Sequence, residues 1–140
     1  MQIMREILFR GKNFDNGVWV QGYYVRLNGN KHFIYTGQSD VDCGNYYPDY
    51  YPVAAKTVGQ FTGLTDKNGT KIFEGDIVKD EYILGKVVYN TKQEDFDGAA
   101  SFMIDDVDDG LQSYRFWNSV EVIGNIHDNP ELLKGGADNG

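Results

Sequence analysis

Short apolar runs alternate with clusters of glycine, asparagine and aspartate along this chain, a pattern that predicts strands joined by tight turns. The clearest example has runs at 61–65 and 70–73 on either side of Asn68-Gly69. An Asn-Gly pair readily adopts the two positive φ angles of a type I′ turn. We therefore expect these two runs to pair as a hairpin.

The first sixty residues continue the same pattern. An apolar run at 7–9 and a run at 18–27, rich in β-branched and aromatic residues, are separated by turn residues. The triplet Asn28-Gly29-Asn30 then turns the chain into a run at 32–35. These features predict a β-rich N-terminal subdomain at 1–60 that begins as a meander.

The pattern breaks at 37–52, which predicts a tyrosine-rich loop at 39–52. Tyrosine provides rigid, amphipathic contact area at a low cost in conformational entropy, so this loop is the best candidate for an interaction site. The alternative is a loop whose rings pack down on the body of the fold. The candidate residues are Tyr46, Tyr47, Tyr50 and Tyr51.

The second half predicts a C-terminal subdomain at 61–134 made of short strands. Runs of strand-forming residues recur at 76–79, 85–89, 99–104, 111–117 and 120–126. Such spacing is typical of a small barrel or sandwich, and we expect an SH3-like barrel. The predicted fold class is therefore mainly β, with short antiparallel strands in two β-rich parts.

The C-terminal end carries a helix-start signal. Asp128-Asn129 precedes Pro130 and Glu131, which places a capping side chain before a proline at the first helical position and an acid in the first turn. This pattern predicts a short C-terminal helical turn. The glycine-rich tail at 135–140 has nothing to bury and is expected to be mobile.

Charge is distributed unevenly over the 140 residues. Residues 1–60 carry six basic and five acidic residues, a net charge of +1, whereas residues 61–140 carry seven and sixteen, a net charge of −9. Nonspecific nucleic-acid binding depends on clustered cations that neutralise phosphates, so the acidic second half argues against this function.

Composition predicts a cytoplasmic protein. No apolar run approaches the roughly 20 residues that span a bilayer, and the N-terminus lacks the layout of a signal peptide. The single cysteine, Cys43, has no intramolecular disulfide partner, which agrees with a reducing compartment.

Acidic residues are concentrated in the window 94–109, which raises the question of a divalent-cation site. A calcium loop needs oxygen ligands at its third and twelfth positions. Starting from Asp105, these positions hold Val107 and Phe116. An EF-hand is therefore not expected, although weak calcium or magnesium binding stays open.

No other pattern predicts catalysis or a cofactor. With only His32 and His127 as imidazoles, a closed zinc site lacks ligands. No nucleophile elbow or phosphate-binding glycine loop is present. We expect Asp66, Glu74 and Asp76 to be turn and surface residues, and we predict no catalytic residue, metal site or cofactor.

Four motifs in a fixed order resemble the YopX family of bacteriophage and prophage proteins. They are MREILFRGK at 4–12, WVQGYY at 19–24, GQFTGL at 59–64 continuing to FEGDIV at 73–78, and VIGNIHDNPELL at 122–133. The resemblance implies a small, mainly β, phage-encoded protein of unknown biochemical function, made in the bacterial host cytoplasm and oligomeric. It implies no catalytic residues.

These observations favour a non-enzymatic interaction or assembly module, a homo-oligomer that also contacts host or phage proteins. One alternative is a nucleic-acid-binding small barrel that stacks bases on the aromatic residues of 114–117. The other is an enzyme with a carboxylate or metal site.

Overall fold

A computed structural model describes the backbone of residues 7–42, 45–90, 101–113 and 117–134. It divides into two compact units, Met1–Phe61 and Thr62–Gly140. The protein is mainly β, and its strands form antiparallel sheets. The predicted tail at 135–140 lies outside the described residues.

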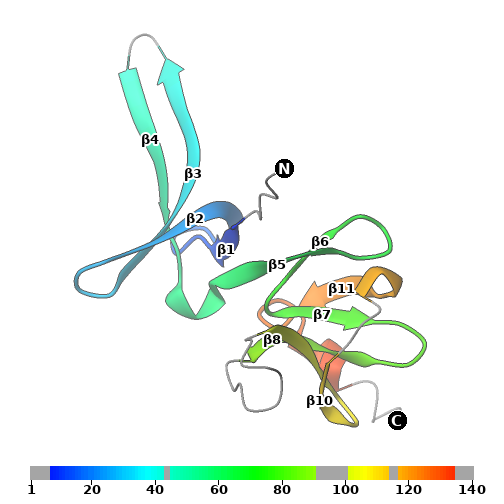
Figure 1. Cartoon of the computed structure of the whole chain (residues 1–140). Helices are drawn as coiled ribbons and strands as arrows, with labels where there is room; N and C mark the ends of the chain where they lie inside the picture. Colours follow the sequence, from blue (N-terminus) through cyan, green and yellow to red (C-terminus); the bar gives the residue numbers. More distant parts are fainter. Residues whose placement is uncertain (1–6, 43–44, 91–100, 114–116, 135–140) are drawn as a thin grey trace. The chain divides into compact units, whose positions relative to one another are not determined.

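The first unit is a meander whose last strand returns beside its first (Figure 1). Its strand order is β4-β3-β2-β1-β5, and the pairings are antiparallel. Strand β5 begins in this unit and ends in the second. The elements are β1 (Phe9–Lys12), β2 (Trp19–Leu27), β3 (Lys31–Asp42), β4 (Asn45–Pro52), the 3₁₀ turn η1 (Ala55–Thr57) and β5 (Gly59–Thr65).

The β2–β3 hairpin confirms the turn predicted at 28–30. Gly29 and Asn30 have φ angles of 79° and 63°, the two positive values that a type I′ turn needs. Beyond this hairpin, the tyrosine-rich stretch differs from its prediction. Residues 39–42 belong to β3 and residues 45–52 to β4, so the stretch predicted as a loop is the greater part of a long hairpin (Figure 1). Tyrosine favours strands, and β4 lies at an edge of the sheet, where proline is tolerated.

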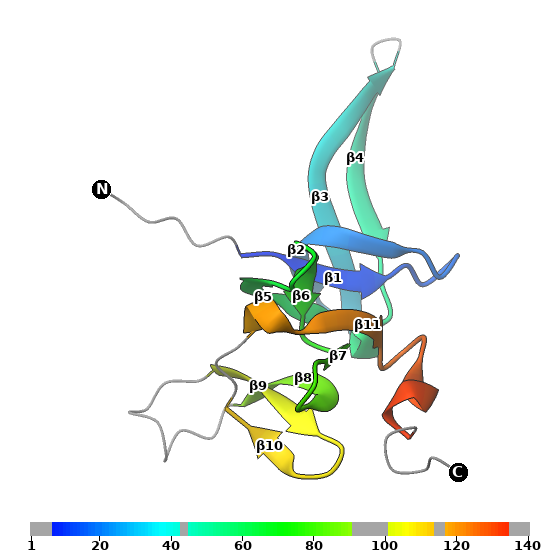
Figure 2. The ribbon, with the colours of Figure 1, turned by 90° about the vertical axis from the view of Figure 1, so that its right-hand side faces the viewer.

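The second unit contains a sheet of five strands in the order β10-β9-β8-β7-β11, and Figure 2 shows β9 and β10 as neighbours. The β6 strand pairs with β5. Neither sheet closes among the described residues, so the predicted SH3-like barrel is not confirmed. The elements are β6 (Lys71–Phe73), β7 (Asp76–Lys79), β8 (Leu84–Asn90), β9 (Ser101–Asp106), β10 (Gly110–Gln112), η2 (Trp117–Ser119), β11 (Glu121–Asn125) and η3 (Pro130–Leu133).

An apolar cluster lies in the core of the second unit. It draws on strands that the turns bring together, and Phe102 and Val122 pack against it. Burial of such side chains is the main favourable term in folding. The members are Ile72, Val78, Ile83, Val87, Ile104, Trp117 and Val120.

The β5–β6 hairpin is confirmed, but its turn is of a different type from the one predicted. Only Gly69 has a positive φ, of 82°, whereas a type I′ turn requires two consecutive positive values. The Gly69 N–H donates to the Asp66 carbonyl oxygen at 3.0 Å, and the Asp66 side chain accepts hydrogen bonds from Asn68 and Thr70. These bonds from Asp66 to the turn, rather than the Asn-Gly pair alone, determine its conformation.

The predicted C-terminal helical turn is the 3₁₀ helix η3, with Pro130 at its start and Glu131 in its first turn. Asn129 makes no side-chain cap; its Oδ1 instead accepts a hydrogen bond from the Asn125 N–H at 3.2 Å. None of the helices in the described part of the chain is long and apolar enough to cross a membrane.

Candidate functional site

A row of three tyrosines crosses strands β2, β3 and β4, and we call it the tyrosine ladder. Tyr23 pairs with Tyr35, and Tyr35 pairs with Tyr50. The Tyr35 and Tyr50 rings stack with centroids 4.7 Å apart, and those of Tyr23 and Tyr35 are 6.4 Å apart. Tyr23 is 59% exposed and Tyr50 is 49% exposed. The ladder is therefore a solvent-facing aromatic surface.

The β2–β3 turn and a glycine position the ladder. The turn at 28–30 sets the register that places Tyr23 opposite Tyr35. Gly22 precedes Tyr23, and a Cβ at this position would lie 2.2 Å from the Tyr35 carbonyl oxygen. Only glycine permits this close approach of the two strands.

Strand alternation separates the tyrosines predicted as interaction residues. Tyr50 belongs to the ladder, whereas Tyr51 pairs with the buried Ile34 and is itself half-buried. Tyr46 and Tyr47 pair in the backbone with residues of β3, but their side chains lie outside the described part of the structure. Sequence reasoning missed Tyr23 and Tyr35, although counting outward from the predicted turn would have paired them.

The stacking of the ladder limits what it can bind. Tyr35 lies between two other rings: the Tyr50 ring stacks on it, and the Tyr23 ring is tilted by 31° with its centroid 6.4 Å away. The stacked faces of Tyr35 and Tyr50 are therefore closed to a base. A base-stacking site needs open ring faces, whereas a protein contact uses ring edges and hydroxyl groups. The arrangement suits a protein surface better than a row of nucleic-acid bases.

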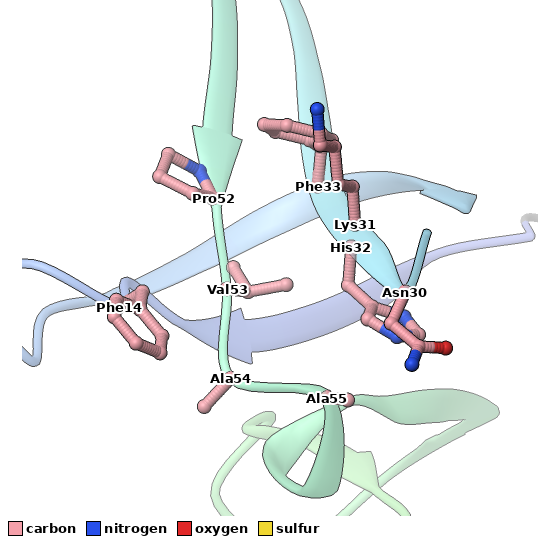
Figure 3. Close-up of a pocket in the computed structure, with 9 residues that line it drawn as sticks. All are labelled: Phe14, Asn30, Lys31, His32, Phe33, Pro52, Val53, Ala54 and Ala55. Atoms are coloured by element: carbon pink, nitrogen blue, oxygen red, sulfur yellow. The ribbon is translucent and has the colours of Figure 1, made fainter. Parts of the chain in front are cut away.

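An open cavity of about 560 Å³ lies elsewhere on the first unit (Figure 3). Figure 3 shows Phe14 on one side, Asn30 and His32 on the other, and the chain from Val53 to Ala55 between them. Its lining is mainly apolar, and the side formed by Asn30 and His32 is polar. Lys31 is the one formally charged residue among the described residues that line it. The lining residues are Phe14, Asn30, Lys31, His32, Phe33, Pro52, Val53, Ala54 and Ala55.

Local hydrogen bonds hold both sides of this cavity. The Phe14 N–H donates to the Pro52 carbonyl oxygen at 2.8 Å, while the Phe14 side chain remains 73% exposed. The Tyr24 hydroxyl and His32 Nδ1 share a hydrogen bond of 2.6 Å, and their rings stack with an interplanar angle of 7°. An exposed phenylalanine and an oriented imidazole are thus present before any partner binds.

The acids that the sequence places in turns of the second unit are structural. Asp66 is buried at 4% exposure and bonds three backbone N–H groups, those of Asn68, Thr70 and Val122, at 2.8 to 2.9 Å. Burial raises the pKa of Asp66, but these three bonds and nearby Lys67 lower it, and the net shift is downward. The expectation that Asp66 is a surface residue is wrong, because its carboxylate joins the β5–β6 turn to β11.

Asp76 and Asp106 are also buried acids whose carboxylates accept backbone N–H groups. Asp76, the first residue of β7, is 2% exposed, and its Oδ2 accepts the Phe73 N–H at 2.8 Å across the turn at 74–75, so it is not a surface residue either. Asp106 accepts N–H groups of Leu84, Asp108 and Asp109 at 3.1, 2.9 and 2.8 Å. Burial raises the pKa of Asp106, and these bonds outweigh burial and lower it.

No cluster of three or more metal-ligating side chains occurs in the part of the chain that the structure describes. The acidic window 94–109 falls partly outside that part, since residues 91–100 are not described. The described acid Asp106 directs both carboxylate oxygens at backbone donors. Cys43 also lies outside the described residues.

The fold and these surfaces define a small, mainly β protein with two compact units and an exposed tyrosine ladder. The model of the YopX protein family matches residues 8–134, nearly the whole chain. The chain therefore belongs to the YopX family. A comparison with curated proteins gives no match.

Proposed function

We propose that this protein is a non-enzymatic interaction and assembly module, and that the tyrosine ladder is its main contact surface. The observation that carries this proposal is the row Tyr23-Tyr35-Tyr50, in which Tyr35 and Tyr50 stack and both Tyr23 and Tyr50 are exposed. Tyrosine is enriched at protein interfaces because one end of the ring is apolar and the other forms hydrogen bonds.

Further exposed apolar side chains of the first unit support the proposal. An apolar side chain exposed singly is ordinary, but several in a unit of this size favour contact with a partner. The unit also holds a cation–π pair, in which the Arg10 guanidinium lies 4.8 Å from the centroid of the Trp19 ring. Besides the ladder residues, the exposed apolar side chains are Ile7, Phe14, Val18 and Leu27.

The family resemblance supplies the setting of the proposal. It implies a phage or prophage protein in a bacterial cytoplasm, and in that setting we propose a homo-oligomer that also contacts host or phage proteins. The backbone donors and acceptors along β4, an edge strand, lie on the same hairpin as Tyr50. Main-chain pairing to such an edge is a common route to protein association, although Pro48 and Pro52 interrupt it here.

The test compares the wild-type protein with the double variant Tyr23→Thr/Tyr50→Thr by sedimentation velocity over a wide concentration range. Threonine preserves strand propensity and removes the rings. We expect the wild type to self-associate and the double variant to require at least tenfold higher concentration. Tyr89→Thr is the matched control, because Tyr89 is a strand tyrosine of similar exposure, 41%, in the second unit.

A wild type that remains monomeric at every concentration would eliminate the assembly part of the proposal. Fluorescence anisotropy with a labelled single-stranded DNA at low salt tests the main alternative. If the wild type binds this DNA, salt weakens the binding and the double variant does not bind, the ladder is a nucleic-acid surface instead.

A further inference from the structure

We infer that the turn carrying Tyr82 in one copy of this chain inserts into the Phe14–His32 cavity of another copy. The inference deepens the proposed function, because it rests on self-assembly and names a second contact. In this contact, different surfaces of the two copies meet. The evidence consists of an exposed aromatic side chain on a rigid turn, a cavity of matching chemistry, and opposite charge.

Tyr82 is the most exposed of the large hydrophobic side chains in the described part of the chain, at 86%. It lies in the turn between β7 and β8. Asp80 stiffens this turn, because its Oδ1 accepts the N–H groups of Tyr82 and Ile83 at 2.7 and 3.0 Å. A turn whose backbone is already fixed loses little backbone entropy on binding, so Tyr82 is placed as an interface anchor.

The cavity offers apolar surface for the ring of a tyrosine and polar groups for its hydroxyl. Phe14, Pro52 and Val53 provide apolar surface for a ring. The imidazole of His32 and the amide of Asn30 line the opposite side, where a hydroxyl group can form hydrogen bonds. At about 560 Å³ the cavity falls in the usual range for ligand pockets, about 300 to 1,000 Å³, and accommodates a ring with part of its turn.

Charge favours contact between the cavity of one copy and the Tyr82 turn of another over contact between two second units. Lys31 lines the cavity, and none of the described residues that line it carries a carboxylate. Tyr82 follows Asp80 and Glu81, and the shallow depression around it also contains Glu121, Lys67 and Lys79, leaving one net negative charge. Across the whole chain, residues 61–140 carry −9, so contact between two second units is repulsive, whereas contact with the cavity is not.

Two variants, one single and one double, each remove one side of this contact. Tyr82→Ser removes the anchor, and Phe14→Ser/Lys31→Glu removes the apolar wall and the cation. We expect each to raise the Kd for self-association at least tenfold in sedimentation velocity, because a buried aromatic anchor contributes at least that factor. Leu111→Ser, at a side chain 53% exposed in the second unit, is the matched control and should leave the Kd unchanged. Circular dichroism verifies that each variant is folded.

Mixing the two variants gives the sharper result. Each variant retains the half that the other lacks, so an equimolar mixture should form pairs with a Kd near that of the wild type and no larger species through this contact. Combining Lys31→Glu with Glu81→Lys should restore part of the association lost by Lys31→Glu alone.

Failure of this inference is distinguishable from failure of the proposed function. If Tyr82→Ser associates as the wild type does while Tyr23→Thr/Tyr50→Thr is impaired, the ladder proposal stands and the Tyr82 contact is overturned. A mixture that fails to recover also overturns it. A wild type that stays monomeric overturns both this contact and self-assembly.

Discussion

Replacing Asp66 with asparagine should destabilise the second unit in a way that its geometry specifies. Oδ1 accepts the N–H groups of Asn68 and Thr70, and Oδ2 accepts that of Val122 at 2.9 Å. Asparagine has one acceptor oxygen and one amide nitrogen, which donates. The oxygen will face the two hairpin donors, because this orientation preserves more bonds, and the nitrogen will then face the Val122 N–H.

The magnitude follows from this count of bonds. A hydrogen bond to a charged group contributes about 1.5–3 kcal/mol. The variant loses the bond from the Val122 N–H completely, and the other two bonds then go to a neutral oxygen instead of a charged one. We expect Asp66→Asn to reduce the free energy of unfolding by about 2–3 kcal/mol. Asp66→Ala, which leaves three donors without an acceptor, should cost about 4 kcal/mol or more.

The assay is urea denaturation followed by tryptophan fluorescence in a Trp19→Phe background. In that background Trp117, in the core of the second unit, is the one remaining tryptophan and reports its unfolding. Asp108→Asn is the matched control, because Asp108 is an exposed acid. It should change the free energy of unfolding by no more than about 0.5 kcal/mol.

The dependence on pH provides a second test. The pKa of Asp66 is lower in the folded protein, so its stabilisation is complete above the pKa of the unfolded chain and disappears as pH falls through the folded value. The difference between wild type and Asp66→Asn should be constant above about pH 5 and shrink below it. A variant within about 0.5 kcal/mol of wild type at neutral pH would refute the structural role of this carboxylate.

Three further predictions concern the second unit. Combining Asp106→Asn with Asp66→Asn should flatten the dependence of stability on pH in acid, because both carboxylates have lowered pKa values in the folded protein. Urea midpoints measured as a function of pH test this, and a slope equal to that of wild type would contradict it. Gly85→Ala should cost at least about 1–3 kcal/mol, because its Cβ would lie 2.3 Å from a carbonyl oxygen of β9, and an unchanged melting temperature would show that β9 shifts freely. Ile104→Ala, at a fully buried side chain, should cost about 2–5 kcal/mol in urea denaturation, whereas Leu111→Ala should cost far less; equal losses would contradict the burial described.

How far the sequence predicts this fold depends on how local each signal is. The hairpins at 28–30 and at 66–70 were predictable, because their turn residues lie next to the strands that they join. The strand residues at 39–42 and 45–52 were not predictable, because the aspartate and proline residues among them are typical of loops. Pairing with β3 at an edge of the sheet makes these residues a strand, and that contact is not visible in local composition.

The sequence also identifies only some of the candidate site residues. Tyr50 was identified from the density of tyrosines, whereas Tyr23 and Tyr35 become site residues only through cross-strand register. In the sequence, Asp66 is one of several acids beside predicted turns. Its contact with Val122 spans 56 positions of the sequence, a pairing that only the folded sheet brings together.

The strand order has a consequence for synthesis on the ribosome. In the first unit the final strand β5 returns beside β1, and in the five-stranded sheet of the second unit the final strand β11 returns beside β7. The first unit has all its strands once residue 61 has emerged, so it can form while the rest is still being translated. In the second unit the buried residues Ile77 and Val78 lie on a sheet edge that stays open until β11 emerges. The nascent chain therefore carries an unpaired apolar edge during this interval, the period in which a chaperone or a wrong strand has access to it.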